Sequence, residues 1–457
     1  MPPAPALNER PIAPSPPGGF PLYHLRPMQT ERLTFLERCA RDYGDVVRLR
    51  FPGGRLAHLI SSPEGVKQIL QDKQKQYDKE TSSFIKMRAF LGRGLLTSDG
   101  EFWLRQRRLI QPGFHRQRIA SFASRMVSDT ELLAEEWERL ADSGATVDLA
   151  HEMMRHTMRI VSKTLLSRDL SGNADRVGRA LAFALRHTSA RITAIFSTPE
   201  RFPTPGNLRY LRARATLDEL VVGLIEQRRQ SGKDEGDLLS MLMLARDEST
   251  GQAMSDEQLR DEVMTLFVAG HDTTASALGW AFYLLDGHPE VAARLASELR
   301  TVLGGRSPTL EDLARLELTR MVIDEAMRLY PPGWLMGRRA MQDDEIGGFF
   351  IPANTFVFVS PWVVQRNPRV WTDPDRFDPG RFSPERASSI PRYAYFPFGG
   401  GPRQCIGQSF ALMEMQLVLA TLFQRFRPKL VPGAVVAVDP QIVLRPRHGL
   451  PMTIRRA

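Results

Sequence analysis

The sequence has very little cysteine. Only Cys39 and Cys405 occur among 457 residues. This scarcity excludes a disulfide scaffold and any zinc or iron–sulfur site that needs several cysteines. It is also typical of proteins from a reducing compartment, so we expect a cytoplasmic protein.

A secretion signal and a membrane anchor are also missing at the start. Residues 1–22 hold eight prolines and no continuous apolar stretch, so we expect a loosely ordered lead-in before a single domain at 23–457. Residues 263–285 are apolar over a length that could span a membrane. However, Asp272 lies near the middle, where a charge costs about 2.5–3.5 kcal/mol on insertion scales. We therefore predict a long buried helix and no membrane anchor.

No strong charge asymmetry marks the chain. Lys and Arg number 61 against 52 Asp and Glu, which gives a net charge of +9. The excess is spread along the chain, so nucleic acid is not expected as a partner.

Helical periodicity dominates what is present. Apolar residues recur at helical spacing over 31–42, 63–71, 102–109, 119–170, 177–194 and 208–229. Strand patterns are few: 46–51 with 56–60 predicts a hairpin, and 349–358 predicts another extended segment. The expected fold class is mainly α with small β-sheets.

The most informative segment runs from Phe398 to Gly407. Three consecutive glycines and a proline predict a tight turn before a helix at 408–423, with Cys405 at the helix start. Such a position favours a thiolate with a lowered pKa, and the glycines would let a flat ligand approach the main chain. The alternative is a buried free cysteine that acts as a small apolar side chain.

This segment resembles the signature of the cytochrome P-450 superfamily of haem-thiolate monooxygenases. Phe398, Gly401, Arg403, Cys405 and Gly407 occupy the five positions of Phe-x-x-Gly-x-Arg-x-Cys-x-Gly. The resemblance implies haem b as the cofactor, with Cys405 as the axial iron ligand and Arg403 at a propionate. Phe398 and Gly407 would complete the haem-binding loop.

A second resemblance involves three distant charged residues. Glu325 and Arg328 form Glu-x-x-Arg, and Pro379–Phe382 stands where the family has Pro-Glu-Arg-Phe. Arg381 would then complete a buried triad that maintains the fold, although Gly380 replaces the family's usual Glu. Without the resemblance, an exposed ion pair would be the ordinary interpretation of Glu325 and Arg328.

The apolar helix carries a third match. Residues 269–274 read Ala-Gly-His-Asp-Thr-Thr, similar to the family's Ala-Gly-x-Asp-Thr-Thr. The resemblance implies that Thr273 hydrogen-bonds the oxygen species and that Asp272 helps to deliver protons. The alternative for Asp272 is a structural pair with a distant Arg.

Further matches concern haem propionates and the C-terminus. Trp103 and Arg107 resemble the family's Trp-x-x-x-Arg helix, and Arg338 falls at another propionate position that Arg339 could also fill. A basic helix is otherwise more typical of a solvated surface. Leu444 to Ile454 resembles the family's final hairpin.

Family position also suggests a substrate pocket. Its candidates are mainly aromatic: Phe84, Phe90, Phe196, Phe267, Ala269 and Trp334. They favour a hydrophobic small molecule such as a fatty acid or terpenoid. Lys86 and Arg88 could bind a carboxylate, but solvent-facing charges are the more ordinary interpretation.

Taken together, the resemblance implies a soluble monomeric monooxygenase of bacterial type that inserts one atom of O2 into its substrate. Flavin and iron–sulfur signatures are missing, so electrons are expected from an external ferredoxin or flavodoxin with its NAD(P)H reductase. The alternative is a non-catalytic haem-thiolate sensor, which would need Cys405 but not Asp272 and Thr273.

Overall fold

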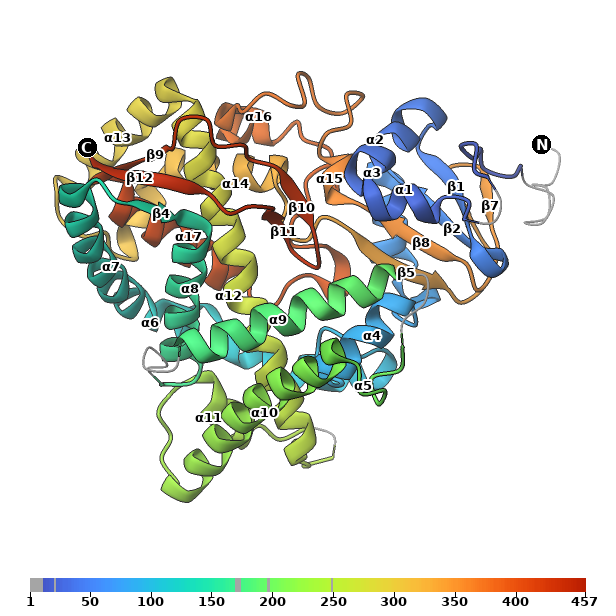
Figure 1. Cartoon of the computed structure of the whole chain (residues 1–457), viewed down its shortest axis with the longest axis horizontal. Helices are drawn as coiled ribbons and strands as arrows, with labels where there is room; N and C mark the ends of the chain where they lie inside the picture. Colours follow the sequence, from blue (N-terminus) through green and yellow to red (C-terminus); the bar gives the residue numbers. More distant parts are fainter. Residues whose placement is uncertain (1–10, 20–21, 169–173, 195–197, 248–249) are drawn as a thin grey trace.

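A computed structural model describes residues 11–19, 22–168, 174–194, 198–247 and 250–457. Its α-helices are α1 (Leu25–Thr30), α2 (Arg32–Tyr43), α3 (Pro63–Lys67), α4 (Ser82–Leu91), α5 (Gly100–Ile110), α6 (Arg116–Ser121), α7 (Ala123–Ser143), α8 (Leu149–Leu165), α9 (Ala174–Thr193), α10 (Pro205–Ser231), α11 (Leu238–Leu244), α12 (Asp256–Gly287), α13 (Pro289–Leu303), α14 (Glu317–Leu329), α15 (Pro361–Val364), α16 (Pro384–Ala387) and α17 (Gln408–Phe423). Its strands are β1 (Val46–Phe51), β2 (Arg55–Ile60), β3 (Tyr77–Asp78), β4 (Thr146–Asp148), β5 (Met336–Ala340), β6 (Asp344–Ile346), β7 (Phe349–Ile351), β8 (Phe356–Val359), β9 (Phe426–Leu430), β10 (Val438–Pro440), β11 (Leu444–Pro446) and β12 (Pro451–Arg456). The predicted class, mainly α with small sheets, is confirmed (Figure 1).

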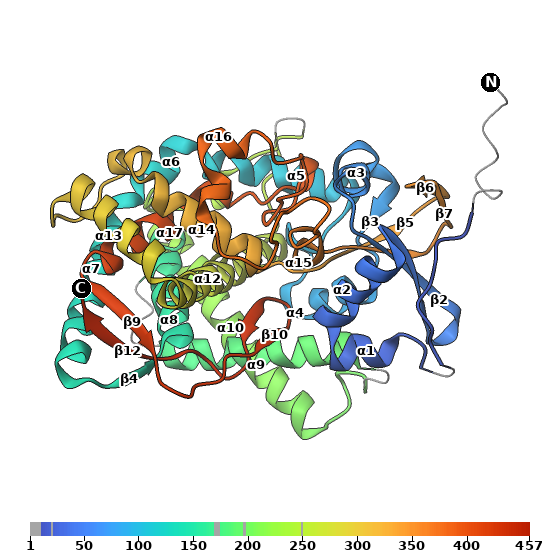
Figure 2. The same ribbon diagram turned by 90° about the horizontal axis from the view of Figure 1, so that it is seen from above.

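The long helix α12 lies at the centre of the molecule (Figure 2). Ser255 and Gln258 close a capping box at its start, which satisfies two backbone N–H groups. It packs against α8, α14 and α17, and most of its residues are buried. In the part of the chain that the structure describes, no helix is long and apolar enough to cross a membrane.

The largest sheet has the strand order β1-β2-β8-β5-β3. The predicted hairpin is present as β1 and β2, which are antiparallel with Val46 opposite Ile60. The predicted extended segment at 349–358 is divided, because β7 pairs with β6 while β8 joins the larger sheet.

The prediction of a final hairpin is wrong. Strand β11 pairs with β10, while β12 lies between β4 and β9. The two strands are therefore not paired with each other: β11 pairs with the strand just before it in the chain, and β12 pairs with two strands from further away. Residues 444–454 connect two separate sheets.

The described part of the proline-rich lead-in is packed against the sheet. The N–H of Arg48 donates to the carbonyl of Pro14 (2.8 Å), and that of Phe350 donates to the carbonyl of Pro11 (3.1 Å). Ala13 is buried between them. Proline lacks an N–H group but keeps its carbonyl, so it can accept hydrogen bonds from the N–H groups of strands. Residues 11–19 are therefore packed on the sheet, whereas their composition predicts a loosely ordered segment.

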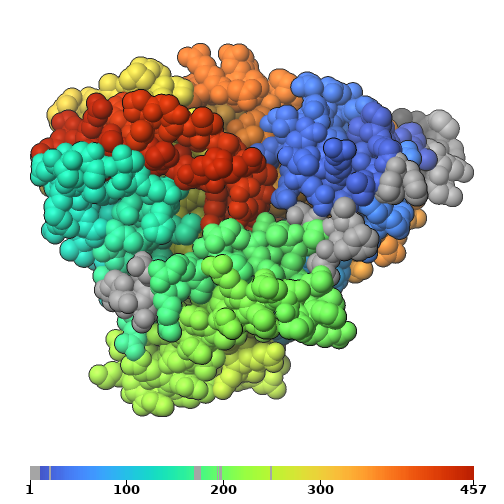
Figure 3. Space-filling view, viewed as in Figure 1, coloured from blue at the N-terminus to red at the C-terminus, as the bar shows by residue number. Residues whose placement is uncertain are grey.

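Helix α2 and strand β10, which belong to the first and last parts of the chain, meet on one face of the molecule. Figure 3 shows the N-terminal segment in blue beside the C-terminal segment in red. Arg32 of α2 donates from Nη1 to the carbonyl of Pro440 in β10 (2.7 Å). This contact closes one side of the cavity described below.

Candidate functional site

Cys405 lies in the loop between a 3₁₀ turn at Gly401–Arg403 and α17. Its N–H donates to the carbonyl of Phe398 (2.9 Å), which holds the loop closed. The residue is accessible, whereas Cys39 is buried. The protein around Cys405 still raises the pKa of its thiol by burial, and this outweighs the opposing effects of the Gly407 N–H and the Arg107 charge. The polypeptide alone therefore does not lower this pKa, contrary to the prediction.

The glycines of this loop serve its packing. A Cβ on Gly400 would lie 2.2 Å from a ring carbon of Tyr393, and one on Gly401 would lie 2.0 Å from the carbonyl oxygen of Leu70. Gly401 also has φ of +63°, which favours glycine. Gly400 and Gly401 thus bring the loop against its protein neighbours, and the approach of a flat ligand to the glycines stays a prediction.

A cluster of buried cations lies next to this loop. It consists of the buried Lys79 and Arg338 and of Arg403, whose side chain is 9% exposed, with Asp99 as their carboxylate neighbour. Arg403 is ion-paired with Asp99 and donates from Nη1 to the carbonyl of Ser98 (3.1 Å). Lys79 donates from Nζ to the carbonyl of Leu96 (2.6 Å).

The charges of this cluster are not balanced. Burial and the charge of Arg403 together lower the pKa of Arg338 to about 10, although Asp99 opposes both effects. Burial and the charges of Arg403 and Arg338 also lower the pKa of Lys79. Three cations thus surround one carboxylate among the described residues, which is an unstable arrangement without an added anion. The two carboxylates of a haem fit this donor set.

Arg339 does not belong to the cluster. It is ion-paired with Asp78, one strand away in the sheet. The charge of Asp99 acts on both arginines that the sequence left open, whereas the charge of Arg403 acts on Arg338.

Trp103 and Arg107, the two residues of helix α5 that the sequence singled out, have different partners. The ring of Trp103 is buried, and the guanidinium carbon of Arg403 lies 4.0 Å from its centre, a cation–π geometry. Arg107 instead donates from Nη1 to the carbonyl of Gln404 (2.9 Å), and its charge acts on Cys405. Trp103 therefore orders the cation cluster, and Arg107 lies at the cysteine.

The middle of α12 has one accessible stretch. Between residues 261 and 282, only Ala269, Gly270 and Thr273 are not buried. The Thr273 hydroxyl donates to the carbonyl of Ala269 (2.9 Å), and Thr274 donates to that of Gly270 (3.1 Å). Such bonds compete with the helical ladder and favour a local bend. Gly270 itself lets α8 approach closely, since a Cβ there would lie 3.2 Å from a methyl of Val161.

Asp272 lies on the buried side of this stretch. It is ion-paired with Arg445 of β11, and its Oδ1 is buried with no hydrogen-bond partner among the residues that the structure describes. The carbonyl of Leu444 accepts a bond from the Ser276 hydroxyl (2.5 Å), which fixes β11 on α12. The pairing with a distant arginine that the sequence left open is therefore present. The sequence analysis did not identify Arg445, because no motif around this residue indicates an ion pair with a carboxylate of α12.

The predicted triad is assembled and fully buried. Glu325 accepts from Arg328 at 2.6 and 2.8 Å and from Arg381 at 3.3 Å. Arg328 also donates to the backbone carbonyls of Gln365, Pro374 and Arg376. At Gly380 a Cβ would lie 2.9 Å from Oδ1 of Asp378, whose side chain caps this turn. The departure from the family's Glu thus leaves room for a local cap.

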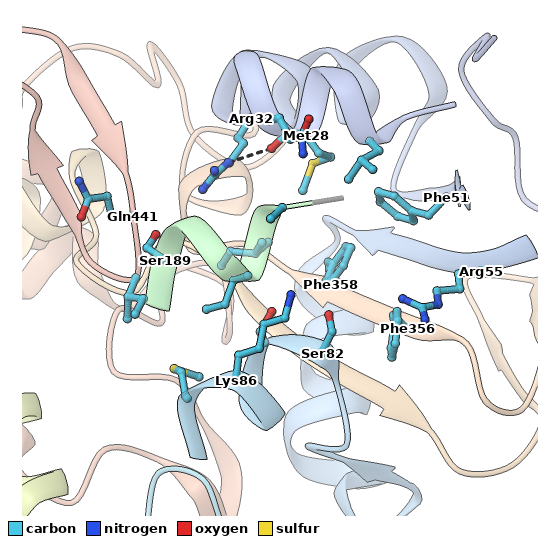
Figure 4. Close-up of a pocket in the computed structure, with 18 of the residues that line it drawn as sticks. Met28, Arg32, Phe51, Arg55, Ser82, Lys86, Ser189, Phe356, Phe358 and Gln441 are labelled. Carbon is cyan, nitrogen blue, oxygen red and sulfur yellow. Dashed lines mark hydrogen bonds between the residues drawn. The ribbon is translucent and has the colours of Figure 1, made fainter. Parts of the chain in front are cut away.

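A cavity of about 530 Å³ opens beside the sheet (Figure 4). Trp334 lines it, together with Met28, Phe51, Met87, Phe356 and Phe358. Phe84, Phe90 and Phe267 are buried and do not line it, while Ala269 is accessible on α12. Phe196 lies outside the described residues. Substrate contact by these five residues stays a prediction.

Comparisons with known proteins agree with this geometry. The model of the family described as Cytochrome P450 matches residues 14–450. Cyclooctat-9-en-7-ol 5-monooxygenase of Streptomyces melanosporofaciens is 40% identical over 422 residues, covering 92% of this chain and 90% of that protein. Pentalenene oxygenase of Streptomyces avermitilis is 35% identical, covering 93% of each. The crystal structure of the cytochrome P450DA heme domain has a TM-score of 0.89 at 29% identity, covering 98% of each chain.

Proposed function

The chain belongs to the cytochrome P450 family and is a haem-thiolate monooxygenase, and we propose that Cys405 is its iron ligand while Arg338 and Arg403 bind the haem propionates. The observation that carries this proposal is the buried cluster of three cations around Asp99, close to an accessible cysteine. Haem b supplies the activation of O2 when it is bound.

The neighbouring residues prepare this site. Trp103 holds the Arg403 guanidinium in place, and the Phe398 carbonyl fixes the loop through the Cys405 N–H. The N–H of Gly407 and the charge of Arg107 both favour a negative sulfur. The buried triad of Glu325, Arg328 and Arg381 maintains the fold without a part in the chemistry.

We assign proton delivery to α12. The Thr273 hydroxyl lies on the accessible stretch, and Asp272 is its sequence neighbour on the buried side. Arg445 holds the Asp272 carboxylate and is itself partly exposed, so Asp272 would take protons from solvent beside this ion pair and pass them to Thr273, while Arg445 keeps its own proton. A haem-thiolate sensor would not need either residue, and their presence favours the enzyme.

The proposed substrate is a terpenoid. Two relatives are named for a cyclooctatenol and for pentalenene, and the cavity walls are rich in aromatic and aliphatic side chains. Phe84, Phe90, Phe267 and Ala269 are proposed as further contacts deeper in the protein, and a fatty acid is the second candidate.

Electrons are proposed to come from a separate ferredoxin or flavodoxin. The exposed arginines of α5 and α6, Arg108, Arg116 and Arg118, lie on the elements next to the cysteine loop. They would attract an acidic partner. Arg116→Glu should slow electron transfer without a change in substrate affinity, and unchanged kinetics would refute this docking face.

The first test is spectroscopic. Dithionite-reduced protein with carbon monoxide should show the strongly red-shifted Soret band of a thiolate ligand, and Cys405→Ala should abolish it. Cys39→Ala is the matched control, since Cys39 is buried away from the site. An unshifted band in the wild type, or a shifted band in Cys405→Ala, would overturn the proposal.

A further inference from the structure

Four backbone carbonyls in the middle of α12 accept hydrogen bonds from side chains. They belong to Phe267, Ala269, Gly270 and His271. The first three accept from side chains of α12 itself, each four residues further along the helix. The fourth accepts from a side chain of α8. Because such bonds compete with the helical ladder, they set the local shape of this part of α12.

The donor from α8 is the hydroxyl of Thr157, whose side chain is fully buried. It lies 2.9 Å from the carbonyl oxygen of His271 and equally close to that of Met153 in its own helix. The carbonyl oxygen of Met154 lies at 3.3 Å. A threonine hydroxyl has one proton to donate. Thr157 therefore divides that proton between the preceding turn of α8 and the neighbouring helix.

A second buried threonine on α8 shows a different arrangement. The Thr164 hydroxyl donates to the carbonyl of Ile160 (2.6 Å), with that of Val161 at 3.5 Å. Both acceptors belong to α8. The hydroxyl of a buried threonine on this helix is thus satisfied within the helix, and the contact of Thr157 with His271 needs a separate reason.

Helix α8 lies along α12 at this point (Figure 1). Val161, one turn after Thr157, approaches Gly270 so closely that a Cβ there would lie 3.2 Å from its methyl carbon. His271 lies about 160° around α12 from Thr273, since each residue turns the helix by about 100°. Helix α8 thus holds α12 on the side of His271, whereas Thr273 lies on the accessible side.

We propose that Thr157 is a positioning residue for the monooxygenase reaction: by holding the His271 carbonyl, it fixes the turn of α12 that presents the Thr273 hydroxyl. This inference rests on the proposed function, in which Thr273 passes protons on. The Thr273 hydroxyl donates to the carbonyl of Ala269 (2.9 Å) and has to release it before it donates elsewhere. The shape of the turn decides how easily it does so, and Thr157 acts on that shape through the backbone of α12.

The test uses the haem-loaded protein and two readouts that need no substrate. One is the infrared stretching band of carbon monoxide on the reduced protein, which responds to hydrogen-bond donors beside it. The other is the rate at which the reduced protein, mixed with air, loses its oxygenated absorption spectrum, which responds to proton supply. Thr157→Val keeps the shape of the side chain and removes the donor. We expect it to shift the infrared band and to change the rate about fivefold, in the same direction as Thr273→Val.

Two further variants separate positioning from packing. Thr157→Ser restores the hydroxyl, so both readouts should return to their wild-type values. Thr164→Val is the matched control, because it removes an equally buried hydroxyl of α8 whose acceptors lie in α8 itself, and it should leave both readouts unchanged. If the valine variant at Thr157 does not fold, Thr157→Ala takes its place with the same expected result.

The outcomes distinguish this inference from the proposed function. Wild-type readouts in Thr157→Val beside altered ones in Thr273→Val would overturn the inference. A failure of Thr157→Ser to restore the readouts, or an equal effect in Thr164→Val, would overturn it as well. A wild type without the red-shifted Soret band, or a Thr273→Val variant that behaves like the wild type, would instead refute the proposed function, and the inference would fall with it.

Discussion

Two buried clusters of charge in this protein are built in opposite ways. In the first, Glu325 accepts four hydrogen bonds, from both arginines of the triad and the N–H of Asp378. In the second, Lys79, Arg338 and Arg403 share one carboxylate. The first cluster is compensated within the chain, and the second is not.

This difference shows how to separate residues that maintain the fold from residues that await a ligand. Buried charges are stable only when paired and hydrogen-bonded. A complete cluster is disrupted by any substitution within it. In an incomplete cluster, the loss of one charge should stabilise the protein as long as no anion is bound. Once the anion is bound, the same loss should be destabilising.

The triad should give the largest effect. Glu325→Gln leaves Arg328 and Arg381 with no buried carboxylate, so we expect a loss of about 3–5 kcal/mol in the free energy of unfolding, or no folded protein. Urea denaturation measures it. Glu317→Gln, exposed on the same helix α14, is the control and should change stability by less than about 0.5 kcal/mol. Equal stability of the two variants would contradict the assignment of the triad to the fold.

The buried carboxyl of Glu262 tests whether an acidic group without enough hydrogen-bond partners also destabilises the fold when it is charged. Burial raises the pKa of Glu262 to about 8, and within the described part of the chain its Oε1 has no hydrogen-bond partner. Between its ordinary value of 4.5 and pH 8, the unfolded chain loses the proton and the folded protein keeps it. Stability should therefore fall as pH rises through this window, by up to about 1.4 kcal/mol per pH unit, and level off above it.

Urea denaturation between pH 5.5 and 8.5 checks this dependence. The difference in stability between the wild type and Glu262→Gln should fall with pH, while Glu257→Gln, exposed in the first turn of α12, should run parallel to the wild type. A Glu262→Gln curve parallel to the wild type would show that this carboxyl is ionised in the folded protein.

Loss of a cation from the cluster of Lys79, Arg338 and Arg403 should have opposite effects on the stability of the haem-free protein and on haem retention. Arg338→Gln removes one of three repelling charges, so the haem-free protein should be as stable as the wild type or more stable. Haem retention, followed by transfer of the haem to an acceptor globin, should weaken by about tenfold. Arg339→Gln, which breaks only the pair with Asp78, should keep haem normally. Haem loss in Arg339→Gln but not in Arg338→Gln would reverse the assignment.

The smallest effect is expected at the pair of Asp272 and Arg445. Arg445→Gln frees a carboxylate that stays buried, so product formation should slow by about two- to fivefold with an altered solvent isotope effect. Arg447→Gln, exposed on the same segment, is the control. Wild-type rates and isotope effects in Arg445→Gln would remove this arginine from the proton route.

Local patterns were sufficient for some elements. The helix α17 begins and ends where glycine and the apolar run place it, and the β1–β2 hairpin follows from its Pro-Gly-Gly turn. Both depend on interactions between near neighbours in the chain. The resemblance also identified the members of the triad, since family motifs record long-range contacts that periodicity cannot reveal.

Contacts between distant segments could not be predicted. Strand β12 takes its partners in β4 and β9, and nothing in its composition selects them. The same holds for Arg445 with Asp272, an ion pair between a strand residue and a helix residue far away in sequence that only the tertiary packing brings together.

The close contact of Gly401 with the carbonyl of Leu70 has a consequence for biosynthesis. The cysteine loop leaves the ribosome when nearly the whole chain has been made, yet its conformation depends on a segment made near the beginning. The contact between the Leu70 segment and the cysteine loop therefore forms only after the loop has emerged from the ribosome. Haem capture is then one of the final events in the life of the nascent chain, and a truncated translation product would be unable to bind the cofactor.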